Sequence, residues 1–136
     1  MKGPVLALST AASADDAERI ALALVEKGVA ACVNVLPGIS STYRWKGKVE
    51  RSDEALLVIK THGERLEELK AAVLAAHLYE VPELVVVPIA DGLSPYLEWL
   101  ASSVGLYVAP AGESPRPRPA PARGRTPGPR RPRSRR

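Results

Sequence analysis

Three residues of the chain are candidate metal ligands, because their side chains carry sulfur, imidazole and carboxylate groups. Cys32 lies in an aliphatic run, His77 lies where a helical pattern ends, and Glu80 follows three residues later. Copper favours thiolate and imidazole over oxygen, so Cys32 and His77 could bind it with Glu80 as a third ligand. Structural alternatives stay open: a lone cysteine in an apolar strand is usually a small core residue, and a histidine at a helix end can satisfy terminal carbonyl groups.

A second set of side chains could form a pocket for a small polar ligand between subunits. Its members supply an ammonium, a phenol, a carboxylate and an indole, a mixture that orients a ligand by charge, hydrogen bonds and ring contacts. They are Lys60, Tyr79, Glu80 and Trp45. Lys60 could equally be the solvated end of a strand, and the two aromatic residues could pack at a contact between subunits.

No catalytic set can be named from the sequence. The chain has no Gly-x-Ser-x-Gly, no Walker loop, no zinc-type cysteine spacing and no His-Glu-x-x-His. The sequence therefore predicts a binding protein and not an enzyme.

The segments that must position these residues alternate between strand and helix patterns. Apolar and β-prone runs predict strands at residues 5–8, 30–36, 40–45, 48–50, 55–60 and 84–89. The turn residues Lys46-Gly47 predict a hairpin between the third and fourth of these runs. Pro37-Gly38 is expected to end the second strand.

Apolar residues spaced three and four apart predict three helices. Ser13 and Thr61 are expected to cap the first two helices, each with an acidic residue three positions later. Gly28 is expected to end the first helix in a left-handed conformation, and the second ends near His77. Ser94-Pro95 begins the third helix, with proline in its first turn.

This order of elements predicts an α+β fold, with two split βαβ units forming a ferredoxin-like sandwich of βαβ, hairpin, αβ and a final α. Its antiparallel sheet would carry both long helices on one face. Pro88 indicates an edge strand, because proline cannot donate to the ladder. The hairpin leaves an unpaired edge that a neighbouring subunit could cover, and a ring of three subunits would close.

Composition divides the chain into a domain at residues 1–105 and a Pro- and Arg-rich tail at residues 106–136. Nine arginines against Glu113 give the tail a charge of +8, which leaves −4 for the domain out of a total of +4. Such a tail is predicted to be disordered and could bind nucleic acid without sequence preference, or have no selected role. The chain lacks a run of about 18 apolar residues and a signal peptide, so we expect no membrane contact and a cytoplasmic location.

Four strings in the chain resemble those of the CutA family of divalent-cation tolerance proteins. They occur in the same order and spacing, and they span most of residues 1–105. They are Ala31-Cys32-Val33-Asn34 with Pro37-Gly38, Tyr43 to Glu50, His77 to Glu83, and Tyr96 to Leu100.

The resemblance implies a tight homotrimer related in shape to the PII signalling proteins, with a link to copper and other divalent cations. Some family members have a second cysteine where this chain has Ser9 and an extra histidine where it has Ala76, so potential ligands are missing. The usual proline after the motif histidine is Leu78 here. The expected function is a trimeric binding protein for copper or another divalent ion. The alternative is a PII-like signalling module that binds a small metabolite in the cleft between subunits.

Overall fold

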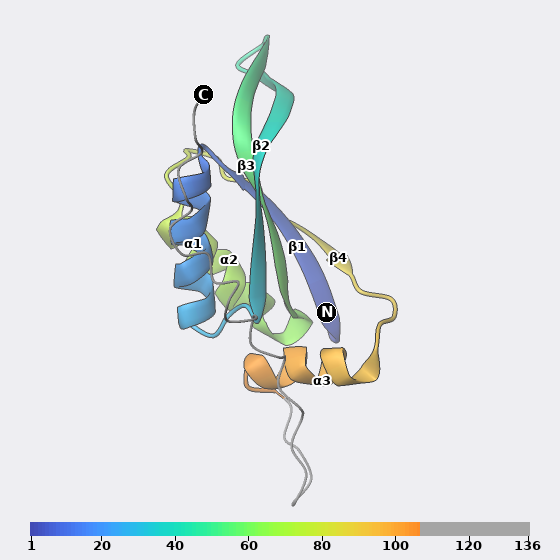
Figure 1. Cartoon of the computed structure of the whole chain (residues 1–136). Helices are drawn as coiled ribbons and strands as arrows, with labels where there is room; N and C mark the ends of the chain where they lie inside the picture. Colours follow the sequence, from blue (N-terminus) through green and yellow to red (C-terminus); the bar gives the residue numbers. More distant parts are fainter. Residues whose placement is uncertain (107–136) are drawn as a thin grey trace, which may run out of the picture.

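The computed structural model describes residues 1–106, which form four strands, three helices and one short 3₁₀ turn (Figure 1). In chain order these are β1 (Pro4–Ala11), α1 (Ala14–Glu26), β2 (Cys32–Trp45), β3 (Lys48–His62), the 3₁₀ turn (Gly63–Arg65), α2 (Leu66–Ala76), β4 (Val85–Pro88) and α3 (Ser94–Ser103). The predicted α+β class and the three predicted helices are confirmed. The prediction of a disordered, nucleic-acid-binding tail concerns residues that, apart from Leu106, lie outside the described part.

The four strands form one antiparallel sheet in the order β2-β3-β1-β4. β1 lies in the interior of the sheet and pairs with β3 on one side and β4 on the other. Pro88 ends β4, which pairs with β1 alone, so the proline occupies an edge strand where its missing amide costs no ladder bond. The edge predicted from Pro88 is confirmed.

One face of the sheet is covered by α1 and α2, which lie beside each other (Figure 1). Side chains alternate along β1 and β3, so every second residue is buried beneath the two helices. The core is aliphatic, and its largest fully buried members include Ile20, Leu24, Leu57, Ile59 and Leu69. α3 lies across one end of the sheet and buries Leu100.

The first helix begins and ends as its sequence predicts. The Ser13 side chain accepts a hydrogen bond from the Asp16 amide at 3.1 Å. Ala17, Ile20 and Leu24 face the core and are fully buried. Gly28 takes a φ of +74° directly after the helix, a conformation that costs glycine little.

The structure corrects the number of strands between Ala30 and Lys60. Pro37-Gly38 does not end a strand: β2 continues through it with a shift in pairing between Leu36 and Ile39, which is a β-bulge. Gly38 permits the bulge with a φ of +74°. β2 and β3 are therefore two long strands joined at the predicted Lys46-Gly47 turn, and they form one continuous hairpin.

The capping role predicted for Thr61 is also wrong. Thr61 is the penultimate residue of β3, it is fully buried, and its hydroxyl donates to the Val29 carbonyl at 2.8 Å. A 3₁₀ turn then leads into α2, whose first residue follows Arg65 without a side-chain cap. A buried hydroxyl needs a partner, and the Val29 carbonyl in the loop before β2 supplies it.

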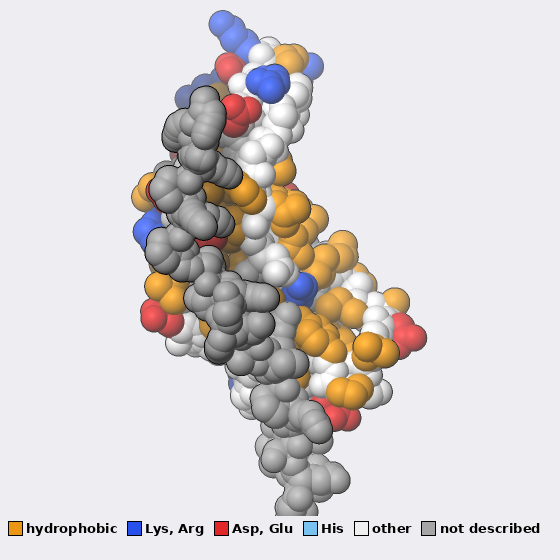
Figure 2. Space-filling model, in the orientation of Figure 1, with side chains coloured by type: hydrophobic (Ala, Val, Ile, Leu, Met, Phe, Trp, Pro, Cys, Tyr) orange, Lys and Arg blue, Asp and Glu red, His pale blue; other side chains and the backbone are white. Residues whose placement is uncertain are grey.

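The other face of the sheet carries no helix, and we call it the open face. It is formed by the residues of each strand that alternate with the buried ones. They are Leu6, Leu8, Thr10, Cys32, Asn34, Leu36, Leu56, Val58, Lys60, Val85 and Val87. Most are aliphatic, and Leu36, Val85 and Val87 are between 45% and 49% exposed. Figure 2 shows hydrophobic side chains gathered over the part of the molecule where β1 and β4 lie.

None of the helices at residues 1–106 is long and apolar enough to cross a membrane.

Candidate functional site

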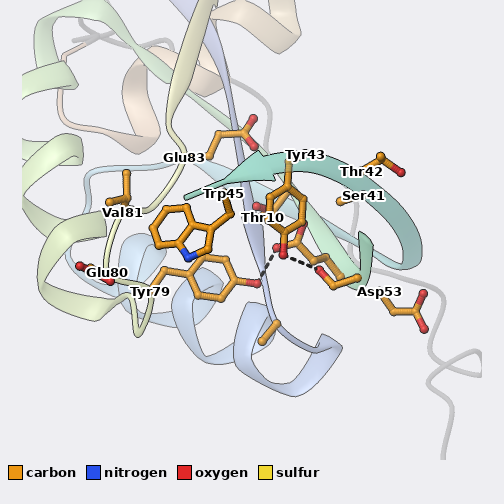
Figure 3. Close-up of a pocket in the computed structure, with 13 residues that line it drawn as sticks. Thr10, Ser41, Thr42, Tyr43, Trp45, Asp53, Tyr79, Glu80, Val81 and Glu83 are labelled. Carbon is orange, nitrogen blue, oxygen red and sulfur yellow. Dashed lines mark hydrogen bonds between the residues drawn. The ribbon is translucent and has the colours of Figure 1, made fainter. Parts of the chain in front are cut away.

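A cavity of about 720 Å³ lies where the hairpin of β2 and β3 meets the segment between α2 and β4 (Figure 3). β3 contributes Glu54 and β2 contributes Tyr43 and Trp45, while the connecting segment contributes Tyr79 and Glu80. Three of the four predicted pocket residues, Trp45, Tyr79 and Glu80, therefore line one cavity. The Lys46-Gly47 turn and the bulge at Gly38 shape the arm of the hairpin that bears Trp45.

The segment after α2 is anchored by its contacts with β1. His77 is 9% exposed, and its Nε2 lies 2.7 Å from the Thr10 carbonyl oxygen. Its Nδ1 accepts a hydrogen bond from the Tyr79 amide at 3.1 Å, so Nε2 carries the proton and donates to Thr10. The Ser9 hydroxyl donates to the Glu83 carbonyl at 2.7 Å. These bonds fix the wall of the cavity that carries Tyr79 and Glu80.

Tyr79 joins the connecting segment to the hairpin. Its hydroxyl donates to Glu54 Oε2 at 2.5 Å, and its ring centre lies 4.7 Å from that of His77. Burial and the hydrogen bond to Glu54 together hold the pKa of the Tyr79 phenol well above its usual range. The phenol therefore stays protonated at physiological pH and keeps its hydrogen bond to Glu54.

The hairpin contributes the aromatic rings of Tyr43 and Trp45, and the connecting segment contributes that of Tyr79; Figure 3 draws all three around the same cavity. The Tyr43 hydroxyl lies 3.2 Å from Ser52 Oγ across the hairpin. Tyr43 and Trp45 remain 42% and 38% exposed. The Lys46 ammonium lies 5.6 Å from the centre of the Trp45 ring, within the range of a cation–π contact.

The charge of the cavity is negative. Four acidic residues line it, and no lysine or arginine of residues 1–106 does so; Asp53, Glu80 and Glu83 are exposed residues at its rim, and Glu54 accepts the hydrogen bond of Tyr79. Arg51 lies 3.8 Å from Asp53, but both side chains are largely exposed. An exposed ion pair of this length offsets little of the field inside the cavity.

Lys60 does not join the predicted pocket. It lies on the open face next to Cys32, its partner in the β2–β3 ladder, and its ammonium donates to the Asn34 side chain. Within the described residues Lys60 thus does not join Trp45, Tyr79 and Glu80, and the pocket expected between subunits stays a prediction. Strand alternation and register explain the separation, since Lys60 lies near the opposite end of β3 from the hairpin turn.

The three predicted metal ligands do not meet within one subunit. Cys32 lies opposite Lys60 in the β2–β3 ladder, and Lys60 lies opposite Leu6 of β1. His77 instead binds the carbonyl of Thr10, which is four residues further along β1. Four strand residues span about 13 Å, which is far beyond the size of one coordination shell. Within residues 1–106 no three His, Cys, Asp or Glu side chains form a group that could hold a metal ion.

The hydrogen bonds of His77 lead to the same conclusion. A metal ligand must offer a free lone pair, and both ring nitrogens of His77 are already hydrogen bonded within the protein. Cys32 is partly exposed, and its sulfur lies 4.0 Å from Asn34 Oδ1. The residues of one subunit thus do not fit a copper site built from Cys32, His77 and Glu80.

Most residues of the cavity could not be named from the sequence, among them four with aromatic or acidic side chains. These four are Tyr43, Asp53, Glu54 and Glu83. Glu54 directly precedes the buried strand run at Ala55, so alternation places it on the other face from the helices. No local pattern, however, brings it to Tyr79, because 25 residues separate the two in the sequence.

Comparison with known proteins gives consistent matches. The family model described as CutA1 divalent ion tolerance protein matches residues 5–103. A Divalent-cation tolerance protein CutA of Thermus thermophilus is 48% identical over 98 residues, which are 72% of this chain and 95% of the relative. Protein CutA, chloroplastic, of Arabidopsis thaliana is 48% identical over 86 residues, and the chain spans about half (47%) of that longer relative.

Solved structures match in shape as well as in sequence. The structure of the divalent cation tolerance protein Cut A1 from Thermus thermophilus superimposes with a TM-score of 0.73 and is 46% identical, covering 75% of this chain and 99% of that one. The crystal structure of CutA from Xylella fastidiosa gives a TM-score of 0.72 at 39% identity, covering 74% and 97% of the two chains.

Proposed function

Because this chain belongs to the CutA1 family of divalent ion tolerance proteins, we propose that it contributes to divalent-cation tolerance as a homotrimer with a ferredoxin-like, PII-like subunit. The strand order and the placement of α1 and α2 on one face support that subunit architecture. The family description names ion tolerance and no reaction, which agrees with a binding role.

The uncovered open face of the sheet is the main support for the proposed trimer. Its aliphatic side chains have no helix over them, and a contiguous apolar surface of this kind marks an interaction site. Burial of one valine or leucine contributes about 1.5 to 3 kcal/mol, so several of them in three copies would stabilise an assembly strongly. The long hairpin adds a free strand edge at β2, which a neighbouring subunit could pair with.

The trimer is tested by the mass of the full chain in dilute solution, measured by size-exclusion chromatography with light scattering. We expect three times the subunit mass of 14.5 kDa. Val87→Asp places a charge on the open face and should give smaller species. Leu22→Asp, at an exposed site on α1, is the matched control and should keep the trimer. A wild-type chain that runs as a monomer would refute the proposal.

Binding of copper or another divalent ion is proposed only from the description of the family. The ligand set Cys32, His77 and Glu80 is not supported by the geometry of one subunit, so no metal is assigned to it. Of the two soft side chains, only Cys32 is free of a strong hydrogen bond and partly exposed.

A second candidate function is the binding of a small metabolite, and the cavity at the hairpin favours it. Its volume of about 720 Å³ lies within the range of small-molecule sites, and it combines aromatic walls with a few polar groups. Thermal-shift measurements with metabolites of different charge test this function. Failure of every compound to raise the melting temperature would count against it.

A further inference from the structure

We propose that the cavity at the hairpin binds an organic cation, that is, a protonated or quaternary amine attached to apolar carbon. The proposal deepens the second candidate function, on which it rests, by naming the class of ligand. It concerns a place that the predicted metal ligand Cys32 does not reach, since Cys32 lies on the open face.

The sign of the charge selects the ligand. A cleft lined with like charges concentrates counter-ions of the opposite sign. Glu80 and Glu83 line the cavity from the connecting segment, and Asp53 and Glu54 line it from β3. No lysine or arginine of residues 1–106 lines the cavity, and the nearby Lys46 ammonium lies against the Trp45 ring, so an anionic metabolite would face mainly acidic side chains there.

The aromatic walls select the carbon part of the ligand. An ammonium group is attracted to the face of an aromatic ring, most strongly to that of tryptophan. The Lys46 ammonium already lies 5.6 Å from the centre of the Trp45 ring, so a ligand cation would compete with it for that ring. Tyr43 lines the cavity from the hairpin and Tyr79 lines it from the connecting segment, and both rings could contact methylene or methyl groups of a ligand (Figure 3).

A bare metal ion fits the cavity less well than an organic cation does. The carboxylates are spread around the cavity, and no three acidic, His or Cys side chains of residues 1–106 converge on a point. Glu54 already accepts a hydrogen bond from Tyr79. A volume of about 720 Å³ is far more than an ion needs, whereas a ligand with separated or dispersed charge could reach several carboxylates at once.

The test is isothermal titration calorimetry of the full chain at low ionic strength with four probes: spermidine, choline, magnesium chloride and adenosine monophosphate. We expect saturable binding of spermidine or choline that weakens as salt is raised, because salt screens the carboxylates. Glu80→Gln removes one charge from an exposed side chain and should weaken this binding roughly 2- to 5-fold. Glu26→Gln removes the same charge at the far end of α1 and should leave it unchanged.

The possible results distinguish the binding of organic cations from metabolite binding in general and from the proposed trimer. Binding of adenosine monophosphate without the amines would support a metabolite site and overturn the cationic class. Binding of magnesium alone, or amine binding that Glu26→Gln weakens as much as Glu80→Gln, would also overturn it. If no probe binds while light scattering still gives a trimer, the cavity proposal fails and the proposed assembly stands.

Discussion

At the scale of single residues, His77 and Tyr79 serve to hold one wall of the cavity. His77 uses both ring nitrogens to bind the backbone of β1 and of its own segment, and Tyr79 donates to Glu54 on β3. The segment from His77 to Glu80, which suggests metal binding in the sequence, thus holds the connecting segment against β1 and β3 through hydrogen bonds. Each of the two residues makes a separate, measurable prediction.

Removing the His77 side chain should lower the free energy of unfolding without changing the affinity for copper. His77→Ala leaves the Thr10 carbonyl and the Tyr79 amide without their partner, which should cost about 1 to 3 kcal/mol of unfolding free energy in urea. A copper titration followed by calorimetry should match that of the wild type at a temperature where both are folded. Copper binding by Cys32→Ser is measured in the same way for comparison. If His77→Ala binds copper more weakly than the wild type and Cys32→Ser does not, His77 is a copper ligand after all.

Tyr79 should make the protein sensitive to alkali. Its pKa is raised in the folded state by burial and by Glu54, so folding favours the neutral phenol. This contribution to stability is complete below the ordinary tyrosine pKa of about 10 and is lost as the pH rises above it, because the unfolded chain then releases the proton first. Urea unfolding at pH 7 and pH 10.5 should show a smaller alkaline loss for Tyr79→Phe than for the wild type.

The control for this measurement is Tyr43→Phe, which removes a more exposed phenol from the same cavity. Its alkaline loss should follow that of the wild type. An identical loss for all three proteins would mean that Tyr79 does not contribute to the pH dependence.

At the scale of elements, the hairpin of β2 and β3 decides the shape of the site. It reaches well beyond the rest of the sheet in Figure 1, and its outer part carries Tyr43 and Trp45 over the connecting segment. The bulge between Leu36 and Ile39 allows β2 to bend while pairing continues on both sides. A clean end to the strand at Pro37 would have left this aromatic wall without support.

Gly38→Ala tests the bulge directly. An added Cβ would meet no atom within 4 Å, so the whole cost comes from holding a non-glycine residue at a φ of +74°. We expect a loss of about 1 to 2 kcal/mol in unfolding free energy. Ser40→Ala, at an exposed position just past the bulge, should change stability by much less, and equal losses for the two variants would argue against backbone strain at Gly38.

At the scale of the whole molecule, the sheet is covered on one side only. α1 and α2 bury one face, while the open face and the edge of β2 stay uncovered in the single subunit. An assembly through these surfaces would couple folding to association. Stability would then depend on the amount of protein present.

The melting temperature should accordingly rise with protein concentration in a dilution series of the full chain. Leu36→Ala, on the open face of the edge strand β2, should lower the melting temperature and steepen its dependence on concentration, because the assembly would bury this side chain. Leu74→Ala, at an exposed site on α2, serves as the control. A melting temperature that is the same at every concentration would speak for a subunit that is stable alone.

The sequence by itself determined the features that depend on near neighbours in the chain. The Ser13 cap, the end of α1 at Gly28, the turn at Lys46-Gly47 and the edge position of Pro88 all follow from local backbone chemistry, and each is found in the structure. The family could also be recognised, because its motifs are short strings whose order survives in one chain.

Only the tertiary structure decided which side chains meet. Lys60 and Cys32 lie on the open face while Tyr79, Glu80 and Trp45 line the cavity, because strand register and alternation assign each residue to one face and one end of the sheet. The bond between Tyr79 and Glu54 joins residues 25 apart in the sequence, and no local preference encodes it. Packing against α1 and α2 fixes the sheet, and the sheet in turn determines where carboxylates and aromatic rings can gather.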